Sequence, residues 1–306
     1  MRERTVNRLL HDLGYRLQSN RKTLEGRAHP DREAQFQDIN RRAKAFQQPG
    51  QPVVAVETTQ QERLGHCRHG GREWPPQGQP EAGQGHDVPD QALGQVMPDG
   101  VYDDAPHTGW VSVGGDHDTA ECAVETVRRW WRQMGRQTSP WAPRLLITAD
   151  GGGSHGSRGR LWTVARQRVA HETGRRSSVG HLPPGTRQWH TIAHRMCCHM
   201  TEHWRGRPWV SREVVVNRIG HTTTKTGLAI RSALDENRDP TGREVTAPPL
   251  ESLAITQEKF HGEWNDTIQP RTYTDSFFWR DSYGCIIRDN REGRNPMRLL
   301  QRVLPT

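Results

Sequence analysis

The stretch LLITADGGGSHGSRGRLW, Leu145 to Trp162, decides the fold, because it joins an apolar run, one aspartate, a glycine cluster and a basic amphipathic segment. The apolar run ends on Asp150 and predicts a buried strand, and the glycines after it predict a tight turn. A helix is expected from about Ser157 to Thr173. Its apolar residues keep the spacing of one helix face: Leu161, Val164, Ala165 and Val169. Strand, turn and helix in this order are typical of an α/β layer.

The glycine cluster also raises the question of a phosphate-binding loop. That motif requires a lysine and a serine or threonine after the second glycine. Here Gly151 and Gly156 have the correct spacing, but Ser157 and Arg158 follow and the lysine is missing. The cluster is therefore interpreted as a strand-to-helix turn that keeps the backbone close to Asp150.

The neighbouring segments extend the α/β pattern in both directions. Strands are expected at residues 52–58, 108–114 and 177–182. A helix is expected to begin at Asp118, which forms a capping-box pattern with Glu121, and to end near Gly135. Further helices are expected near residues 4–13, 34–46, 188–204 and 211–219, and the Pro-, Gly- and Gln-rich residues 75–100 should form a long excursion. In the helix 188–204 one apolar face should lie against the sheet: Trp189, Ile192, Ala193, Met196, Met200 and Trp204.

The composition narrows the class of protein. The 306 residues carry a formal charge of +8 and a pI of about 9.7, and only four of the 43 basic residues are lysine. Arginine forks suit phosphate and base edges, so a polyanion is the expected partner, with a solvated basic surface as the alternative. No run of 18 apolar residues and no signal peptide occur, and five cysteines do not make a disulfide framework. An intracellular, cytoplasmic protein with reduced thiols is expected.

Acidic residues stand at the ends of two expected strands. Glu57 ends the first strand and Asp150 the third, and Asp116 or Asp118 follows the strand between them. Because strand ends converge in an α/β layer, these carboxylates could share Mg²⁺ or Mn²⁺, as in two-ion phosphoryl transfer. The alternative is that each acid is a solvated turn residue or a helix cap.

Two other clusters have alternative interpretations. His190 and His194, one helical turn apart, could hold zinc with Cys198, although the glutamate of a zinc-protease motif is missing. Arg128 and Arg129 precede Trp130 and Trp131, an interleaving found on nucleic-acid-binding surfaces, but the helical register places one of these tryptophans in the core.

Ordered motifs along the chain resemble one family, the Rhodopirellula-type DDE transposases of bacterial insertion sequences. The motifs are GREW, GVYD, TGWVSVG, ITADGGGS, HETG, HLPPGT, QWHTIAHR, HWRGRP, TTTKTGL and FHGEWN, and the resemblance covers about residues 5 to 270. It implies a ribonuclease-H-like core in which three acids bind two Mg²⁺ or Mn²⁺ ions. It also implies that the protein cleaves and joins DNA at transposon ends.

The resemblance places the three acids on Glu57, Asp150 and Ala193. Only Asp150 keeps the residue type of the family. Glutamate at 57 moves the carboxylate by about 1.5 Å, one carbon–carbon bond, and the methyl group of Ala193 cannot coordinate a cation. Glu202, the first acid after Ala193, lies nine residues further on and points to the opposite helix face.

These departures lead to the expected organisation and function. Residues 1–49 are interpreted as a basic helical remnant of a DNA-binding region, 50–206 as the catalytic core, 207–270 as the C-terminal part of the transposase region and 271–306 as a divergent tail. The expected function is a DDE transposase that binds DNA, could form a homo-oligomer, and is impaired in cleavage. The alternative is a non-catalytic DNA-binding relic that modulates an intact transposase.

Overall fold

The computed structural model describes residues 3–15, 29–59, 61–66, 76–79, 93–115, 119–152, 156, 159–204, 206, 208–237, 253–271, 278–280 and 286–288. Their strands are β1 Val53–Thr58, β2 Glu62–Arg63, β3 Gln95–Asp103, β4 Thr108–Gly114, β5 Arg144–Ala149, β6 Arg176–His181, β7 Ala229–Leu234, β8 Ile255–Gln257, β9 Asn265–Ile268, β10 Phe278–Arg280 and β11 Ile286–Arg288. Their helices are α1 Glu3–Asp12, α2 Arg32–Gln47, α3 Ala120–Trp130, η1 Trp131–Gly135, α4 Arg136–Thr138, α5 Arg160–Thr173, η3 Arg187–Trp189, η4 Ala193–Cys197, α6 Cys198–Trp204 and α7 Arg212–Gly220. None of the described helices is both long and apolar enough to cross a lipid bilayer.

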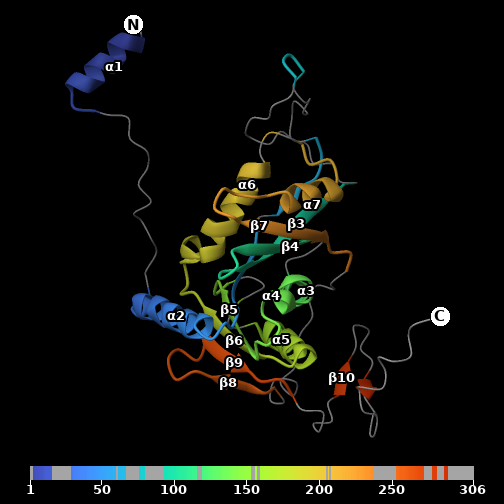
Figure 1. Cartoon of the computed structure of the whole chain (residues 1–306). Coiled ribbons are helices and arrows are strands. Elements are labelled where there is room, and N and C mark those ends of the chain that lie inside the picture. Colours follow the sequence, from blue (N-terminus) through green and yellow to red (C-terminus); the bar gives the residue numbers. More distant parts are fainter. Residues whose placement is uncertain are drawn as a thin grey trace, which may run out of the picture.

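One mixed sheet organises the molecule (Figure 1). Its strands follow the order β7-β4-β3-β1-β5-β6-β9-β8, and β2 pairs with β3 outside this path. The strands β1, β5 and β6 are parallel, whereas β3 is antiparallel to both β1 and β4. The central order β4-β3-β1-β5-β6 with an antiparallel β3 is the ribonuclease-H-like arrangement, so the predicted fold class is confirmed.

Each face of the sheet is covered by its own helices and core. On one face α3 and α5 bury Trp130, Trp131 and Trp162 against β1 and β5. On the other face η4, α6 and α7 bury Ile192 and other apolar side chains against β3, β4 and β7. Side chains alternate between faces along a strand, so Val54 and Val56 join the first core and Ala55 the second. Glu57 continues the alternation of Ala55 and faces η4.

The helix α2 lies across β6 and connects it to β9. A side chain at Gly180 would come within 3.3 Å of Ile39 Cγ1, so the glycine allows the helix to approach the strand closely. The buried Gln35 donates to the backbone oxygen of His181 at 2.9 Å and to Asn265 Oδ1 at 3.0 Å. Asn265 in turn donates to Gln35 Oε1 at 2.9 Å, so a buried amide pair fixes α2 against β9.

The predicted excursion at residues 75–100 is too long at its C-terminal end, because β3 begins at Gln95. Pro98 and Gly100 lie inside this strand and obscured its pattern. Gly100 leaves room for Met196, since a Cβ there would lie 2.6 Å from Met196 Cε and this side chain would have to move. The strands β7, β8 and β9 were also not foreseen, because they are short and mixed in polarity.

The helix α3 differs from its prediction at both ends. Thr119 is the N-cap, and its side chain accepts from the backbone N–H of Cys122, whereas Asp118 lies outside the described residues. At the C-terminal end the chain widens into the π-helical turn η1, which buries Trp131 as well as Trp130. Arg128 and Arg129 are paired with Glu125. The expectation of a single core tryptophan was wrong, and this arginine–tryptophan cluster is packed and paired within the protein.

The segment predicted as one helix from 188 to 204 is broken near its start. The short turn η3 ends at Trp189, and His190 has an extended backbone before the helical conformation resumes at residue 191. Ile192, Met196 and Met200 face the core as expected, but Trp189 is 54% exposed. The helical register does not continue through His190, so Trp189 lies on the surface.

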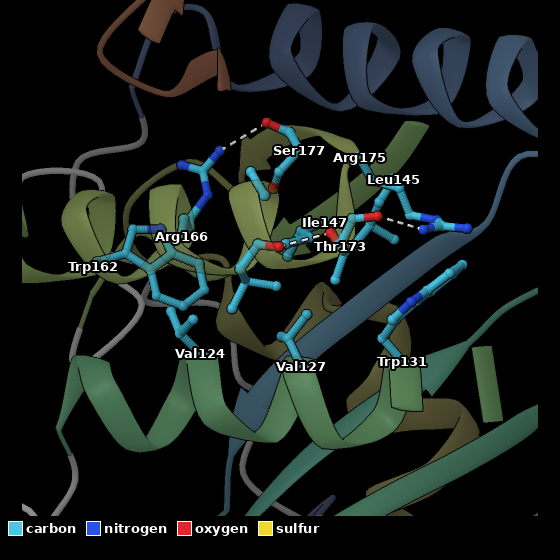
Figure 2. A pocket seen from close by; sticks show the side chains of 12 residues that line it. Val124, Val127, Trp131, Leu145, Ile147, Trp162, Arg166, Thr173, Arg175 and Ser177 are labelled. Atoms are coloured by element: carbon cyan, nitrogen blue, oxygen red, sulfur yellow. Dashed lines mark hydrogen bonds between the residues drawn. The ribbon is translucent and has the colours of Figure 1, made fainter. Parts of the chain in front are cut away.

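A small apolar pocket lies between α3, α5 and the sheet (Figure 2). Val124, Val127 and Ile147 form part of its wall, and Arg166 lies at one end, where its guanidinium donates to Ser177 O at 3.2 Å. The pocket belongs to the face of Val54 and Val56, opposite to the face of Glu57. It is therefore a gap in the core rather than a part of the strand-end site.

We expect the stability of the protein to depend on pH through Asp103, at the end of β3. Its side chain is 2% exposed, and burial, with the charge of Asp104, raises the pKa of Asp103 to about 7. Because the pKa of Asp103 is higher in the folded than in the unfolded protein, folding favours the protonated carboxyl. The contribution of Asp103 to the free energy of unfolding is therefore fully present below pH 4 and is lost as the pH rises through 7. The loss approaches about 4 kcal/mol at 1.4 kcal/mol per pKa unit.

Urea unfolding of wild type and Asp103→Asn at pH 5 and pH 8 measures this effect. The amide carries no charge at either pH, so the variant should gain stability relative to wild type at pH 8. Asp104→Asn is the matched control, because Asp104 is exposed and should show a smaller difference. Equal pH dependence in wild type and Asp103→Asn would contradict the prediction.

Candidate active site at the ends of β1 and β5

Glu57 and Asp150 lie at the same edge of the sheet. The strands β1 and β5 pair in parallel with Val56 opposite Ala149; Glu57 is the next residue of β1, and Asp150 directly follows the end of β5. Glu57 is 7% exposed, and Asp150 is half-buried. The parallel pairing therefore brings these two residues to the ends of adjacent strands. Asp116 and Asp118, the other acids considered for this edge, lie outside the described residues.

Arg187 binds the carboxylate of Glu57. Its Nε donates to Glu57 Oε1 at 2.6 Å, and its Nη2 donates to the backbone oxygen of Thr58, also at 2.6 Å. Sequence reasoning missed this residue, since an arginine after the Pro-Pro-Gly turn has no motif of its own. The two contacts hold the guanidinium across the end of β1 and occupy one oxygen of Glu57.

The same guanidinium also interacts with Asp150. Partial burial lowers the pKa of Arg187, but its hydrogen bond to Glu57 and the charges of Glu57 and Asp150 raise this pKa overall. Arg187 therefore places one positive charge near both acids. In a site built for divalent ions, the ions themselves supply this charge.

The segment containing Ala193 faces the other oxygen of Glu57. His190 is 1% exposed, with its Nδ1 3.7 Å from Glu57 Oε2 and its Nε2 3.4 Å from Thr148 Oγ1. Burial and the charge of Glu57 raise the pKa of the Cys197 thiol. Ala193 lies between His190 and Cys197 in the chain, three residues after one and four before the other. Both of these neighbours interact with Glu57, and Ala193 begins the π-helical turn η4 that follows His190.

These residues do not fit a two-ion site. Two acids stand at the strand ends, Ala193, on which the resemblance places the third acid, has only a methyl group, and Glu57 Oε1 is already bound to Arg187. In the described part of the chain, no three ligand atoms around Glu57 and Asp150 lie within 4.8 Å of one another. Glu202, the acid that follows on the helix, is 66% exposed and lies 3.8 Å from His199 instead.

The zinc alternative at His190, His194 and Cys198 is wrong. His194 is exposed, and its Nε2 lies 2.5 Å from the backbone oxygen of Gln188. Cys198 donates to the backbone oxygen of His194 at 2.9 Å, and His190 lies buried beside Glu57. These three side chains do not form a ligand group among the described residues.

The strand order and the acids at the ends of β1 and β5 place the chain in the class of ribonuclease-H-like proteins. Residues 1–270 match the family described as "Rhodopirellula transposase DDE domain". The chain belongs to this transposase family. A comparison with curated proteins finds no match.

Three similar solved structures are transposase complexes. The first is described as the Mos1 transposase paired-end complex with left transposon end, at 12% identity and a TM-score of 0.45, covering 69% of this chain and 60% of that one. The Mos1 mariner paired end complex with Mn has 13% identity and a TM-score of 0.42, covering 70% and 60%. The Mos1 Strand Transfer Complex has 12% identity and a TM-score of 0.44, covering 69% and 59%. The chain thus spans about three fifths of their length, and similarity of this size supports no inference about activity.

Proposed function

We propose that this chain is a DDE transposase by descent that binds DNA and is impaired in cleaving it. The observation that carries the proposal is the Arg187–Glu57 ion pair at the end of β1. It is supported by the alanine at residue 193, on which the family resemblance places the third acid. An acid held by arginine and a missing acid both reduce the affinity of the site for divalent cations. The complete site of the family would hold Mg²⁺ or Mn²⁺ on three carboxylates, of which Glu57 and Asp150 are the two that this chain offers.

Arginine-rich composition supports DNA as the partner. The net charge is +8, and phosphate contacts by arginine would supply affinity without reading the sequence. Beside the candidate site, the exposed Trp189 has the guanidinium of Arg32 5.8 Å from its ring centroid. An exposed aromatic ring next to basic side chains is a platform on which unpaired bases stack. The proposal includes assembly with further copies on DNA in the bacterial cytoplasm.

The alternative is a non-catalytic relic that occupies DNA or joins an intact transposase. The Arg187–Glu57 pair favours it, because the pair neutralises the acid without a metal ion. The two interpretations differ in residual activity. An impaired transposase should retain slow cleavage that depends on Asp150, whereas a relic should retain none.

We expect the wild-type chain to bind DNA and to nick it poorly. Incubation with supercoiled plasmid and Mn²⁺ should give little nicked product, and gel-shift titrations should show an association constant that falls with salt concentration. Asp150→Asn is the control, since any slow nicking that belongs to this site must disappear in it while DNA binding remains. Rapid nicking by wild type that Asp150→Asn abolishes would overturn the proposed impairment, and failure to bind DNA would overturn the proposed partner.

A further inference from the structure

A second cluster of potential ligands lies away from the strand ends. His29 and Asp31 precede and begin α2, and His261 lies in the turn between β8 and β9. Among the described residues, this is the one group of three or more His, Cys, Asp or Glu side chains whose ligand atoms all lie within 4.8 Å of one another. It joins parts of the chain that are 230 residues apart.

The spacing of the ligand atoms is close to that of a tetrahedral zinc site. Zinc bonds of about 2.0 to 2.2 Å place neighbouring ligand atoms about 3.3 to 3.6 Å apart. Asp31 Oδ2 lies 3.0 Å from His261 Nε2 and 3.9 Å from His29 Nδ1. The two distances lie on either side of the required value, so small side-chain rotations are enough to centre an ion.

Neighbouring groups orient both imidazole rings for metal binding. His261 Nδ1 lies 2.6 Å from Glu263 Oε1, and a carboxylate in this place holds a histidine so that Nε2 faces the metal. His29 Nδ1 accepts a hydrogen bond from the backbone N–H of Asp31 at 3.2 Å, so this nitrogen carries the lone pair, and zinc binding would exchange that hydrogen bond for a bond to the ion. Each histidine therefore presents the nitrogen that lies nearest to the Asp31 carboxylate.

The cluster is also held in place by ring packing and by the contact between the Asp31 carboxylate and His261. The His261 ring stacks on Trp264 with centroids 4.3 Å apart, and His29 meets the same indole edge-on at 4.7 Å. Asp31 occupies the N-cap position of α2, yet its side chain makes no capping hydrogen bond. Its carboxylate turns to His261 instead, and His261 adopts a left-handed backbone with φ of 45°.

We propose that His29, Asp31 and His261 bind one zinc ion that joins the start of α2 to the β8–β9 turn. Two imidazoles and one carboxylate suit zinc better than magnesium, because imidazole is a poor ligand for magnesium. Three protein ligands leave a fourth position for water. The ion stabilises the folded chain by mass action, since it binds the folded form and links two distant segments. This site is independent of the proposed function.

Zinc titration of the full chain tests the proposal. After removal of metals with a chelator, calorimetry with ZnCl₂ and elemental analysis should show one zinc per chain. Asp31→Asn and His261→Gln should each lose this zinc, and Glu263→Gln, which keeps all three ligands, should bind it about 10- to 100-fold more weakly. The melting temperature of wild type, but not of His261→Gln, should rise with zinc.

The control is the pair His194→Gln with Cys198→Ser, which removes two neighbouring exposed ligands elsewhere on the surface. Zinc retained in this control supports the site, and zinc lost in it overturns the assignment. If wild type takes up no zinc, or if His261→Gln binds it as tightly, the cluster is only a charged contact between His261 and its two carboxylates. Should His261→Gln not fold, Glu263→Gln decides, and an unchanged affinity in that variant would overturn the proposal.

Discussion

The triple variant Glu57→Asp, Arg187→Gln and Ala193→Glu should bind Mn²⁺ and nick supercoiled DNA at least about 100-fold faster than wild type. Each change removes one obstacle: the first shortens the first acid, the second releases it from its ion pair, and the third supplies the missing carboxylate. Asp150 is unchanged and completes the set. Displacing a reacting group by about 1 Å costs on the order of 100-fold in rate, so the restored geometry should matter as much as the restored charge.

Two matched variants separate charge from shape in this experiment. In the triple variant, Gln in place of Glu at position 193 has the same size without the charge and should stay inactive. Addition of Asp150→Asn to the active variant should abolish both nicking and calorimetric Mn²⁺ binding. If the triple variant titrates with Mn²⁺ as wild type does and leaves the plasmid intact, Glu57, Asp150 and position 193 do not form one site.

Asp266→Ala should destabilise the protein by about 3 to 5 kcal/mol. Arg166 lies on α5 with 2% of its side chain exposed, and its Nη2 and Nη1 donate to the two oxygens of Asp266 on β9 at 2.7 and 3.2 Å. Removal of the carboxylate leaves a buried guanidinium whose remaining acceptor is the backbone oxygen of Ser177. The cost of a buried, uncompensated charge exceeds that of a lost surface pair.

Urea denaturation monitored by tryptophan fluorescence measures the loss. Glu172→Ala is the matched control, because Glu172 is 40% exposed where it pairs with Arg128 and should contribute at most about 1 kcal/mol. Arg166→Met with Asp266→Leu removes both charges and should recover most of the stability lost in Asp266→Ala. A loss as small as that of Glu172→Ala would show that water reaches Arg166 readily.

Local patterns were sufficient to predict much of the fold. The strands at 53–58 and 144–149 follow from continuous apolar runs, which are buried on both faces of the sheet. The faces of α3 and α5 follow from helical spacing, because burial of one helix face imposes that period. The strand β3 could not be found in this way, since Pro98 and Gly100 interrupt its pattern. The space beside Gly100 is filled by Met196, a residue 96 positions later in the chain, which local spacing could not indicate.

Some features of the candidate site could likewise be predicted from the sequence, and others could not. The positions of Glu57 and Asp150 at the ends of their strands, and the absence of an acid at 193, could be read from the sequence. The role of Arg187 could not, because nothing in HLPPGTRQWH shows that the turn after β6 carries this side chain to the end of β1. The prediction that Trp189 is buried was wrong for a related reason, since the extended backbone of His190 interrupts the helix and changes the register.

The sequence by itself determined the α/β class, the family, the charge that favours a polyanion and the residue types at the three positions that the resemblance assigns to acids. These features depend on composition and on short-range spacing, which need no knowledge of the folded chain. Only the tertiary structure showed that Arg187 forms an ion pair with Glu57, and that His29 and Asp31 lie next to His261. Those contacts join segments 130 and 230 residues apart. Such pairings depend on the order and register of strands in the sheet, which no local pattern encodes.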